Sequence, residues 1–298
     1  MNLEHYKKLL IETAKIYTFE KINKDLRIDE IKSSNKSICF LRHDIDFSPS
    51  TALKMAQVEA EEGISSTFTI LLTGQYYSPF EKKTKDCLKE IMNYGHEIGL
   101  HFDPKAYDIN SELHLDKFVK KEARILEDIM QSSITMFSFH NTTDFSMSCR
   151  EEKYGNLVNA YSKFFLDHVE YTSDSNGYWR FKTWKELLSK KHKIIQILTH
   201  PIWWGENSTL PPFETVVQNC LERFCNQVSD YTKLFNDQDS RINKSALTKF
   251  LHGTLKQNDS SILRSYSVYY PLIEVLLDKS SQDCQENLDK IARDFLKQ

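Results

Sequence analysis

The sequence predicts an α/β protein whose main part is a closed or slightly broken barrel of parallel strands and helices. Two observations lead to this prediction: short apolar segments alternate with helical segments of 10 to 20 residues, and this alternation ends near residue 205. Strands separated by helices of that length form right-handed βαβ units and therefore a parallel sheet. The pattern alone leaves an open parallel sheet as an alternative.

The elements follow one another along the chain. Residues 3–17 are amphipathic and predict a first helix, and in a second helix Ser48 or Ser50 suits the start and Gly63 the end. The strand-like segments are expected at 37–46, 65–73, 96–103, 134–140, 156–162, 169–174 and 193–201. The helices between them are expected at 48–63, 81–95, 111–130 and 182–191.

These elements predict three parts of the chain. We expect an N-terminal helical segment at 1–36, a catalytic barrel domain at 37–211, and a helical C-terminal extension at 212–298 that packs on the barrel. Pro211 and Pro212 mark the last boundary, because helical periodicity without a convincing strand begins there.

Composition and charge argue against several classes of protein. The net charge is −3 and the pI is about 6.4, so nothing attracts the whole chain to nucleic acid. No stretch approaches 18 apolar residues, and the charged N-terminal segment lacks the features of a signal peptide. The six cysteines are scattered, as free thiols in a reducing compartment would be. We therefore expect a cytoplasmic protein without a membrane span.

Ionisable side chains gather at the ends of the apolar segments. "LRHDID" places two carboxylates and a histidine at the end of the first strand, and "LHFD", "SFHN" and "LTHP" end three later strands. The carboxyl ends of barrel strands open at one mouth, where active sites lie. One such ending is unremarkable, but four endings with His or Asp indicate a functional constellation.

The two-residue period of a strand sorts these side chains by face. Asp44 and Asp46 share one face, which directs both into the mouth, while His43 points the other way. On the third strand, His101 and His96 lie on opposite faces. We therefore interpret His101 as a candidate ligand and His96 as a structural histidine that is hydrogen-bonded behind the sheet.

Carboxylates and imidazoles in one pocket suit a divalent metal ion. Catalytic zinc has about three protein ligands and an open position for water, whose pKa falls toward ~7. We expect Asp46, His101 and His140 to be the ligands of zinc, with cobalt or nickel as alternative ions. Two close carboxylates repel each other, so Asp44 is the expected general base. His200 is the expected acid that protonates the leaving group.

These stretches resemble the polysaccharide deacetylases of the NodB-homology type, carbohydrate esterase family four. The resemblance is carried by "LRHDID", "GHEIGLHFD", "FSFHN" and "ILTHP" and covers residues 37–205. It implies a (β/α)7-type distorted barrel and metal-assisted removal of an N- or O-acyl group from a sugar. The family's base and metal-binding carboxylates correspond to Asp44 and Asp46. Its first ligand histidine corresponds to His101, and its acid to His200.

Two departures from the family pattern affect the site. The family usually has a second metal histidine four residues after the first, and that position is Lys105 here, which is a poor ligand while it is protonated. We expect His140, where the family carries an Arg-Pro motif, to take the vacant ligand position. The second departure is "RHDID" in place of the usual Thr-Phe before the carboxylates. The resemblance therefore implies a divergent branch.

Polar and aromatic residues near these strand ends are candidates for binding the substrate. Asp174 and Arg180 could orient the base or hold an anionic group, although a loop held by its own salt bridge is about equally expected. Trp203 or Trp204 could stack on a sugar ring, and one of the pair is expected to belong to the core. Asn141 could donate to an oxyanion. The expected substrate-binding residues are Arg42, Asn141, Asp174, Arg180 and Trp203.

The sequence thus predicts a metal-dependent carbohydrate deacetylase, with a role in the biosynthesis of a surface polysaccharide. Because no export signal is recognised, the expected substrate is a nucleotide- or lipid-linked sugar. Two alternatives stay open. One is a non-catalytic carbohydrate- or partner-binding protein on a degenerate barrel, which Lys105 favours. The other is a metal-dependent amidase acting on a small non-sugar amide. The sequence does not predict the oligomeric state.

Overall fold

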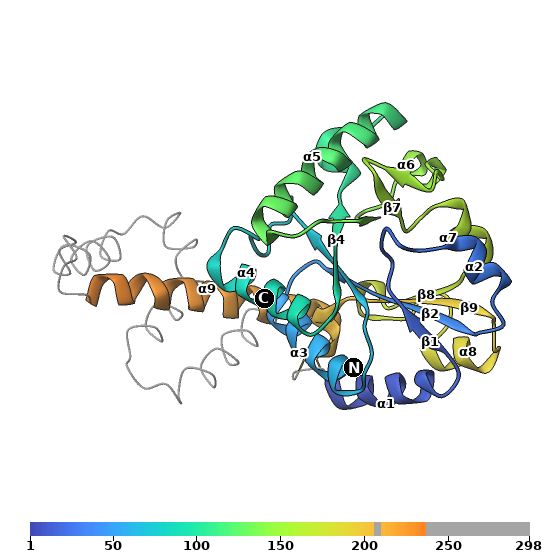
Figure 1. Cartoon of the computed structure of the whole chain (residues 1–298). Coiled ribbons are helices and arrows are strands. Elements are labelled where there is room, and N and C mark those ends of the chain that lie inside the picture. The colour runs from blue at the N-terminus through green and yellow to red at the C-terminus, as the bar shows by residue number, and fades with distance from the viewer. Residues whose placement is uncertain (206–209, 237–298) are drawn as a thin grey trace. The chain divides into compact units, whose positions relative to one another are not determined.

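The computed structural model describes residues 1–205 and 210–236 (Figure 1). Its strands are β1 (Thr18–Glu20), β2 (Ile38–Ile45), β3 (Thr67–Leu71), β4 (Glu97–Phe102), β5 (Met136–Phe139), β6 (Lys153–Tyr154), β7 (Leu157–Asn159), β8 (Glu170–Ser173) and β9 (Ile194–Thr199). Its α-helices are α1 (Leu3–Ala14), α2 (Ile28–Ser33), α3 (Pro49–Glu61), α4 (Lys82–Asn93), α5 (Glu112–Met130), α6 (Asp144–Ser148), α7 (Lys163–His168), α8 (Trp184–Ser189) and α9 (Pro212–Asn236). Short 3-10 helices lie at η1 (Pro104–Tyr107), η2 (Ser175–Gly177) and η3 (Pro201–Trp204).

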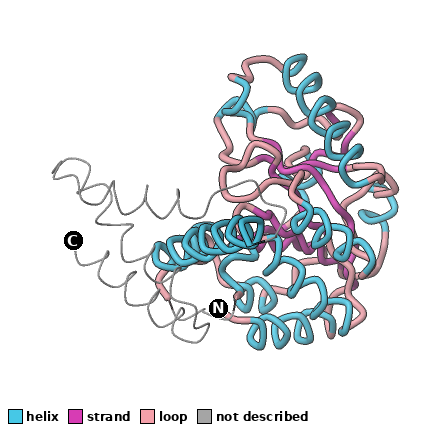
Figure 2. Tube along the Cα trace, turned by 90° about the vertical axis from the view of Figure 1, so that its left-hand side faces the viewer, coloured by secondary structure: helices cyan, strands magenta, loops and turns pink. Residues whose placement is uncertain are grey.

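The strands form one sheet in which seven neighbours run parallel in the order β7-β5-β4-β3-β2-β9-β8. The last strand, β9, pairs with β2 and so returns to the start of the barrel. In Figure 1 the helices of the first 205 residues lie around the outside of this curved sheet, and Figure 2 shows the strands between helices from a second direction. The prediction of a (β/α)7-type distorted barrel is confirmed. Within the described residues, no pairing closes the sheet between β7 and β8.

Two short strands extend the sheet beyond this pattern. β1 pairs in parallel with the first half of β2, beside the part that pairs with β3, and β6 pairs antiparallel with β7. The sequence analysis did not predict these strands, nor α2, α6 and α7. Segments of two to six residues contain too few side chains to display a period. The segment 1–36, expected to be helical, therefore also contributes β1 to the sheet.

The chain divides into two compact units, Met1–Thr215 and Val216–Gln298. The first contains all the strands named above. Of the expected helical extension at 212–298, α9 accounts for 212–236, and the remainder lies outside the described residues. The three-part division of the chain and the packing of its last part on the barrel stay predictions. Throughout the described ranges, no helix combines the length and the apolar composition that crossing a membrane requires.

The ends of α3 show how local sequence sets an element that borders the site. Ser48 caps the helix, because its hydroxyl accepts a hydrogen bond from the Thr51 amide at 3.3 Å, and Pro49 follows at the first helical position. The chain leaves the helix through Gly63, whose φ of +69° suits a residue without a side chain. These residues fix where α3 begins, shortly after Asp44 and Asp46, and where it ends.

The interior of the barrel changes from apolar to polar along β2. Phe40, near the start of the strand, packs in a buried cluster with Ile22, Met136 and other apolar side chains. Side chains two residues apart share a face, so Arg42 and Asp44 continue the same interior row. The apolar layer closes the amino-terminal end of the barrel. The carboxylates and imidazoles of the candidate site lie at or near the carboxyl ends of the strands.

Candidate metal centre and active site

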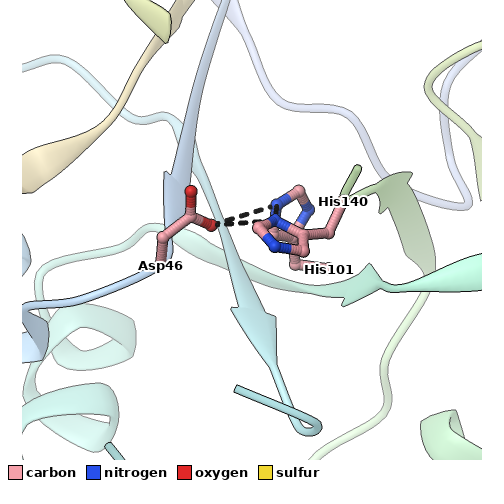
Figure 3. A group of neighbouring side chains, drawn as sticks. All are labelled: Asp46, His101 and His140. Carbon is pink, nitrogen blue, oxygen red and sulfur yellow. Dashed lines mark hydrogen bonds and ion pairs between the residues drawn. The ribbon is translucent and has the colours of Figure 1, made fainter. Parts of the chain in front are cut away.

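Three strand ends bring together the side chains expected to bind metal. Asp46 follows the last residue of β2, His101 lies within β4, and His140 follows β5. His101 Nε2 lies 3.2 Å from Asp46 Oδ1, and His140 Nδ1 lies 3.3 Å from the same oxygen. The two imidazole nitrogens are 3.1 Å apart, and Figure 3 shows all three side chains pointing toward one another. The structure therefore assembles the predicted ligand set from distant parts of the sequence.

This trio fits a divalent metal ion. Its three candidate ligand atoms lie within 4.8 Å of one another, and no other group of three such residues among those described has this spacing. Asp46 Oδ1 is buried and receives no hydrogen bond of ordinary geometry. One carboxylate oxygen and two imidazole nitrogens are a donor set of catalytic zinc, which has about three protein ligands. Lys105 lies exposed in η1 and is not part of the group.

The close contacts within the trio shift the pKa values of Asp46 and His140. Burial alone would raise the pKa of Asp46, but its close contacts with His101 and His140 and the charges of His101 and His200 together outweigh burial and hold this pKa well below its usual value. Burial alone would lower the pKa of His140, but the contact with Asp46 and the negative charges of Asp46, Asp103 and Asp44 together outweigh it, and the pKa is raised. Since a metal ion needs neutral imidazole, protons compete with metal for these ligands, and affinity falls as the pH falls.

Asp44 lies deeper than Asp46 and is surrounded by donors. Its Oδ1 accepts hydrogen bonds from Thr69 Oγ1 at 2.6 Å and from Ser138 Oγ at 3.3 Å. Arg42 contacts both oxygens, with Nε 3.1 Å from Oδ1 and Nη2 3.2 Å from Oδ2. Burial raises the pKa of Asp44, but the charges of Arg42, His101 and His200 and the hydrogen bond from Thr69 together outweigh this effect, and the pKa is lowered. Asp44 is therefore ionised, as a general base must be.

Arg42 serves this carboxylate rather than the substrate. Its side chain is 1% exposed, and the guanidinium lies over the ring of Tyr161 at 5.3 Å. The Tyr161 hydroxyl is also within 3.4 Å of Nη2. The expectation that Arg42 binds substrate needs correction, because the guanidinium is enclosed between Asp44 and Tyr161 inside the barrel.

His200 faces Asp46 from the opposite side of the mouth. Its Nε2 lies 3.9 Å from Asp46 Oδ2, while Nδ1 lies 2.8 Å from Asp174 Oδ1. Burial alone would lower the pKa of His200, but the hydrogen bond to Asp174 and the negative charges of Asp174, Asp46 and Asp44 together outweigh it and raise the pKa to about 9. His200 therefore carries a proton at neutral pH, as a general acid must.

Asp174 is the residue that orients His200. It is fully buried, and its two oxygens accept hydrogen bonds from His200 and from Trp204 Nε1, the latter at 2.7 Å. Asp174 is expected from the sequence to orient the base or to bind an anionic group of the substrate, but it contacts His200, the expected acid, and its buried oxygens leave none exposed for substrate. Trp204 belongs to the core, as expected for one of the tryptophan pair. Trp203 is half-buried beside it, so part of its ring is available to a ligand.

Two further candidates for substrate binding lie on exposed turns. Asn141 directly follows His140 and adopts a φ of +49°, a left-handed conformation that asparagine tolerates. The side chain of Arg180 is exposed, and its backbone amide donates to the Ser173 carbonyl at 3.4 Å. Both side chains are open to solvent near strand ends, and their roles in substrate binding stay predictions.

The outer face of the sheet holds the other two histidines of the motifs. His96 Nε2 contacts the Ala56 carbonyl at 2.9 Å behind the sheet, which confirms a structural role. His43 also points away from the mouth, as predicted. Its Nδ1 lies 2.7 Å from Thr199 Oγ1 and its Nε2 lies 3.0 Å from Glu59. These contacts tie β2 to β9 and α3 directly behind the site.

Sequence analysis missed the hydroxyl groups that support the site. Thr69 and Ser138 are fully buried inside the barrel and bond to Asp44. The sequence did contain a signal: each is a small polar residue with an apolar residue on either side of it in its strand, so it lies on the opposite face of the sheet from those two neighbours. Tyr77 gave no such signal: its hydroxyl donates to the Ile45 carbonyl at 2.7 Å and accepts from the Leu71 amide at 2.9 Å. It thereby clamps the ends of β2 and β3.

Comparison with known proteins gives similarity only at the level of solved structures. No family model matches the chain, and no curated protein sequence matches it. One similar structure is the Streptococcus pyogenes deacetylase PplD in complex with acetate, at 11% identity and a TM-score of 0.38, covering 74% of this chain and 87% of that one. Another is a carbohydrate esterase family four domain of a multidomain xylanase from the hindgut metagenome of Trinervitermes trinervoides, at 13% identity and a TM-score of 0.38, covering 65% and 85%.

A third similar structure is a pseudoenzyme of carbohydrate esterase family four from Bacillus anthracis, at 14% identity and a TM-score of 0.37, covering 63% of this chain and 62% of that one. The family that the motifs resemble is thus the one found among the solved structures. With TM-scores below 0.5, these similarities assign no activity to this chain. The function has to be argued from the residues of the site.

Proposed function

We propose that this chain is a metal-dependent hydrolase that removes an acetyl or other acyl group from a sugar or sugar precursor. The observation that carries the proposal is the cluster of Asp46, His101 and His140, with Asp44 and His200 beside it. The ion they would hold supplies Lewis acidity, which polarises a carbonyl and makes water more acidic.

The residues around the trio divide the proton transfers between them. In the proposal, Asp44 accepts a proton from the attacking water, and Arg42 keeps this carboxylate ionised between turnovers. His200 donates a proton to the departing amine or alcohol, and Asp174 holds its ring in position. A base and an acid whose pKa values lie far apart are both in the correct protonation state at neutral pH.

Solvent exposure indicates which of these groups a substrate meets. The side chains of Asp46, His140 and His200 are 15%, 21% and 12% exposed, whereas that of Asp44 is 2% exposed. An acyl group approaching the mouth therefore meets Asp46, His140 and His200 first, whereas His101 is as buried as Asp44. Asp44 acts from beneath them through Oδ2, which has fewer hydrogen-bond donors around it than Oδ1.

The expected substrate is a nucleotide- or lipid-linked acetylated sugar. Half-buried Trp203 and the exposed Arg180 are the candidates for contacting its ring and its phosphate. The experiment therefore uses a panel of acetylated sugars rather than one compound.

Acetate release tests the proposal. The purified full chain, loaded with zinc, cobalt or nickel, is incubated with acetylated nucleotide-linked and lipid-linked sugars and with small non-sugar acetamides. We expect acetate from at least one sugar, and its loss in Asp44→Asn and His200→Asn, while His114→Asn on the exposed start of α5 keeps full activity.

Three other outcomes would contradict the proposal or favour one of its alternatives. Acetate from small amides alone would favour the amidase alternative. Metal binding without acetate from any substrate would contradict the hydrolase and favour a carbohydrate- or partner-binding protein on the same barrel. A chain that binds none of the three ions would contradict the metal site.

A further inference from the structure

Ser138 lies at the junction between the candidate metal ligands and the candidate base. This side chain, on β5, is fully buried inside the barrel. Its Oγ is 2.7 Å from His101 Nδ1, 3.2 Å from Thr69 Oγ1 and 3.3 Å from Asp44 Oδ1. It is therefore within hydrogen-bond distance of both the imidazole that faces the metal site and the carboxylate beneath it.

The proton positions in this group follow from its composition. Both oxygens of Asp44 contact the Arg42 guanidinium, which can only donate, so the carboxylate is an acceptor and Thr69 donates its single hydroxyl proton to it at 2.6 Å. Thr69 and Asp44 are then both acceptors for the single proton of Ser138. That proton points away from His101, and the lone pairs of Ser138 are free to accept from Nδ1.

This direction is the one that metal binding by His101 requires. Nε2 is the ring nitrogen that faces Asp46 Oδ1 at 3.2 Å, so Nε2 must offer its lone pair to the ion. The ring proton then resides on Nδ1, where it needs an acceptor. If Ser138 donated to Nδ1 instead, its lone pairs would face the Asp44 carboxylate and the ring proton would block the metal position.

We infer that Ser138 is a positioning residue that selects the metal-binding tautomer of His101 and links this ligand to Asp44. The inference rests on the proposed metal site. Its consequence is that metal affinity and the state of the base are coupled through one hydroxyl group. Groups of this kind that orient metal ligands typically contribute 10–100-fold to metal affinity.

Zinc affinity of the purified full chain, measured by competition with a chromophoric chelator, tests the inference without any substrate. We expect Ser138→Ala to weaken zinc binding by about 10–100-fold, because Nδ1–H then faces no acceptor. Ser138→Thr keeps the hydroxyl and is expected to restore most of the affinity. The matched control is Thr135→Ala, just before the same strand, which removes a buried hydroxyl bonded to Glu97 at 2.8 Å. It is expected to leave the affinity unchanged.

Two further measurements separate positioning from a merely structural role. The visible spectrum of the cobalt-loaded protein is expected to change in Ser138→Ala and to stay the same in Thr135→Ala. A structural role alone predicts a lower melting temperature of metal-free Ser138→Ala with unchanged zinc affinity and spectrum, and that result would overturn the inference. Equal loss of affinity in Ser138→Thr and Ser138→Ala would also overturn it. A wild-type chain that binds no zinc would overturn the metal site itself, and this inference with it.

Discussion

Every buried charge in the mouth of the barrel has an opposite charge or a donor beside it. Asp44 is paired with Arg42, Asp46 with His101 and His140, and Asp174 with His200. An unpaired buried charge costs several kcal/mol, so each pair fixes both partners in position and in protonation state. At the scale of single residues, this pairing keeps the Asp44 carboxylate ionised and the His200 imidazole protonated.

The bond between Asp174 and His200 gives a prediction about pH. Asp174 contributes most among the carboxylates that raise the pKa of His200 to about 9, so Asp174→Asn is expected to lower that pKa toward or below its ordinary value. NMR titration of His200 in metal-free protein measures the shift. If His200 is the acid, the alkaline limb of the activity profile moves to lower pH in the same variant. Asp86→Asn, which breaks an exposed ion pair on α4, is the control and should move neither. An unmoved His200 titration would contradict the role given to Asp174.

Arg42 gives a prediction about stability. Arg42→Met leaves the Asp44 carboxylate buried without its partner, and breaking a buried pair in this way costs about 3–5 kcal/mol of unfolding free energy. The double variant Arg42→Met, Asp44→Asn has no buried charge at this position and is expected to recover part of the loss. Urea denaturation of the metal-free proteins measures both. A double variant no more stable than Arg42→Met would show that the carboxylate is not what the guanidinium stabilises.

At the scale of elements, short hydrogen-bonded connections fix the strand ends that form the site. Tyr77 joins the ends of β2 and β3, and His43 joins β2 to β9 through Thr199. On α5, Glu122 accepts from Tyr107 in η1, just after the strand that bears His101. The elements carrying the ligands are therefore held by contacts outside the site as well as within it.

The contact between α5 and η1 predicts a pH-dependent stability. Glu122 is fully buried and one of its oxygens has no partner, and burial, opposed only in part by the Tyr107 hydrogen bond, raises its pKa from 4.5 to about 7. Below about pH 4.5 the carboxyl is protonated in both the folded and the unfolded chain. Between pH 4.5 and 7 only the unfolded chain loses this proton, so the unfolding free energy falls as the pH rises, by on the order of 3 kcal/mol.

Glu122→Gln is neutral at every pH and should lack this fall. Denaturation at a series of pH values, compared between the wild-type chain and the variant, checks the prediction. The two curves are expected to diverge as the pH rises from 4.5 to 7, in favour of the variant. Parallel curves across this window would mean that Glu122 is ionised in the folded protein.

At the scale of the whole molecule, the site is complete within the first compact unit. The side chains around the metal centre lie between Arg42 and Trp204, and the unit runs from Met1 to Thr215. The return of β9 to the edge of β2 is what brings His200 to Asp46, because these residues are far apart in the sequence. The order of the strands in the sheet is therefore what brings His200 to Asp46.

This gives a prediction about truncation. A chain that ends after Thr215 keeps every contact described at the site, and we expect it to fold and to bind zinc with the affinity of the full chain. Chelator competition and circular dichroism of the two proteins provide the comparison. Weaker binding by a folded shorter chain would show that residues beyond Thr215 contribute to the site.

The sequence by itself determined the strand ends and the face on which each side chain lies. Alternation along a strand is a local property, so Asp44 and Asp46 could be assigned to the mouth and His43 and His96 to the far side without knowledge of the fold. The same local argument identified His101 and His200 as members of the site.

Only the tertiary structure decided which of these groups meet. The pairing of Arg42 with Asp44, the orientation of His200 by Asp174, and the place of Ser138 between His101 and Asp44 depend on strand order and on the spacing across the barrel interior. A hydrogen bond or an ion pair requires contact within a few ångströms, and residue types and periodicity alone do not fix such distances between separate strands.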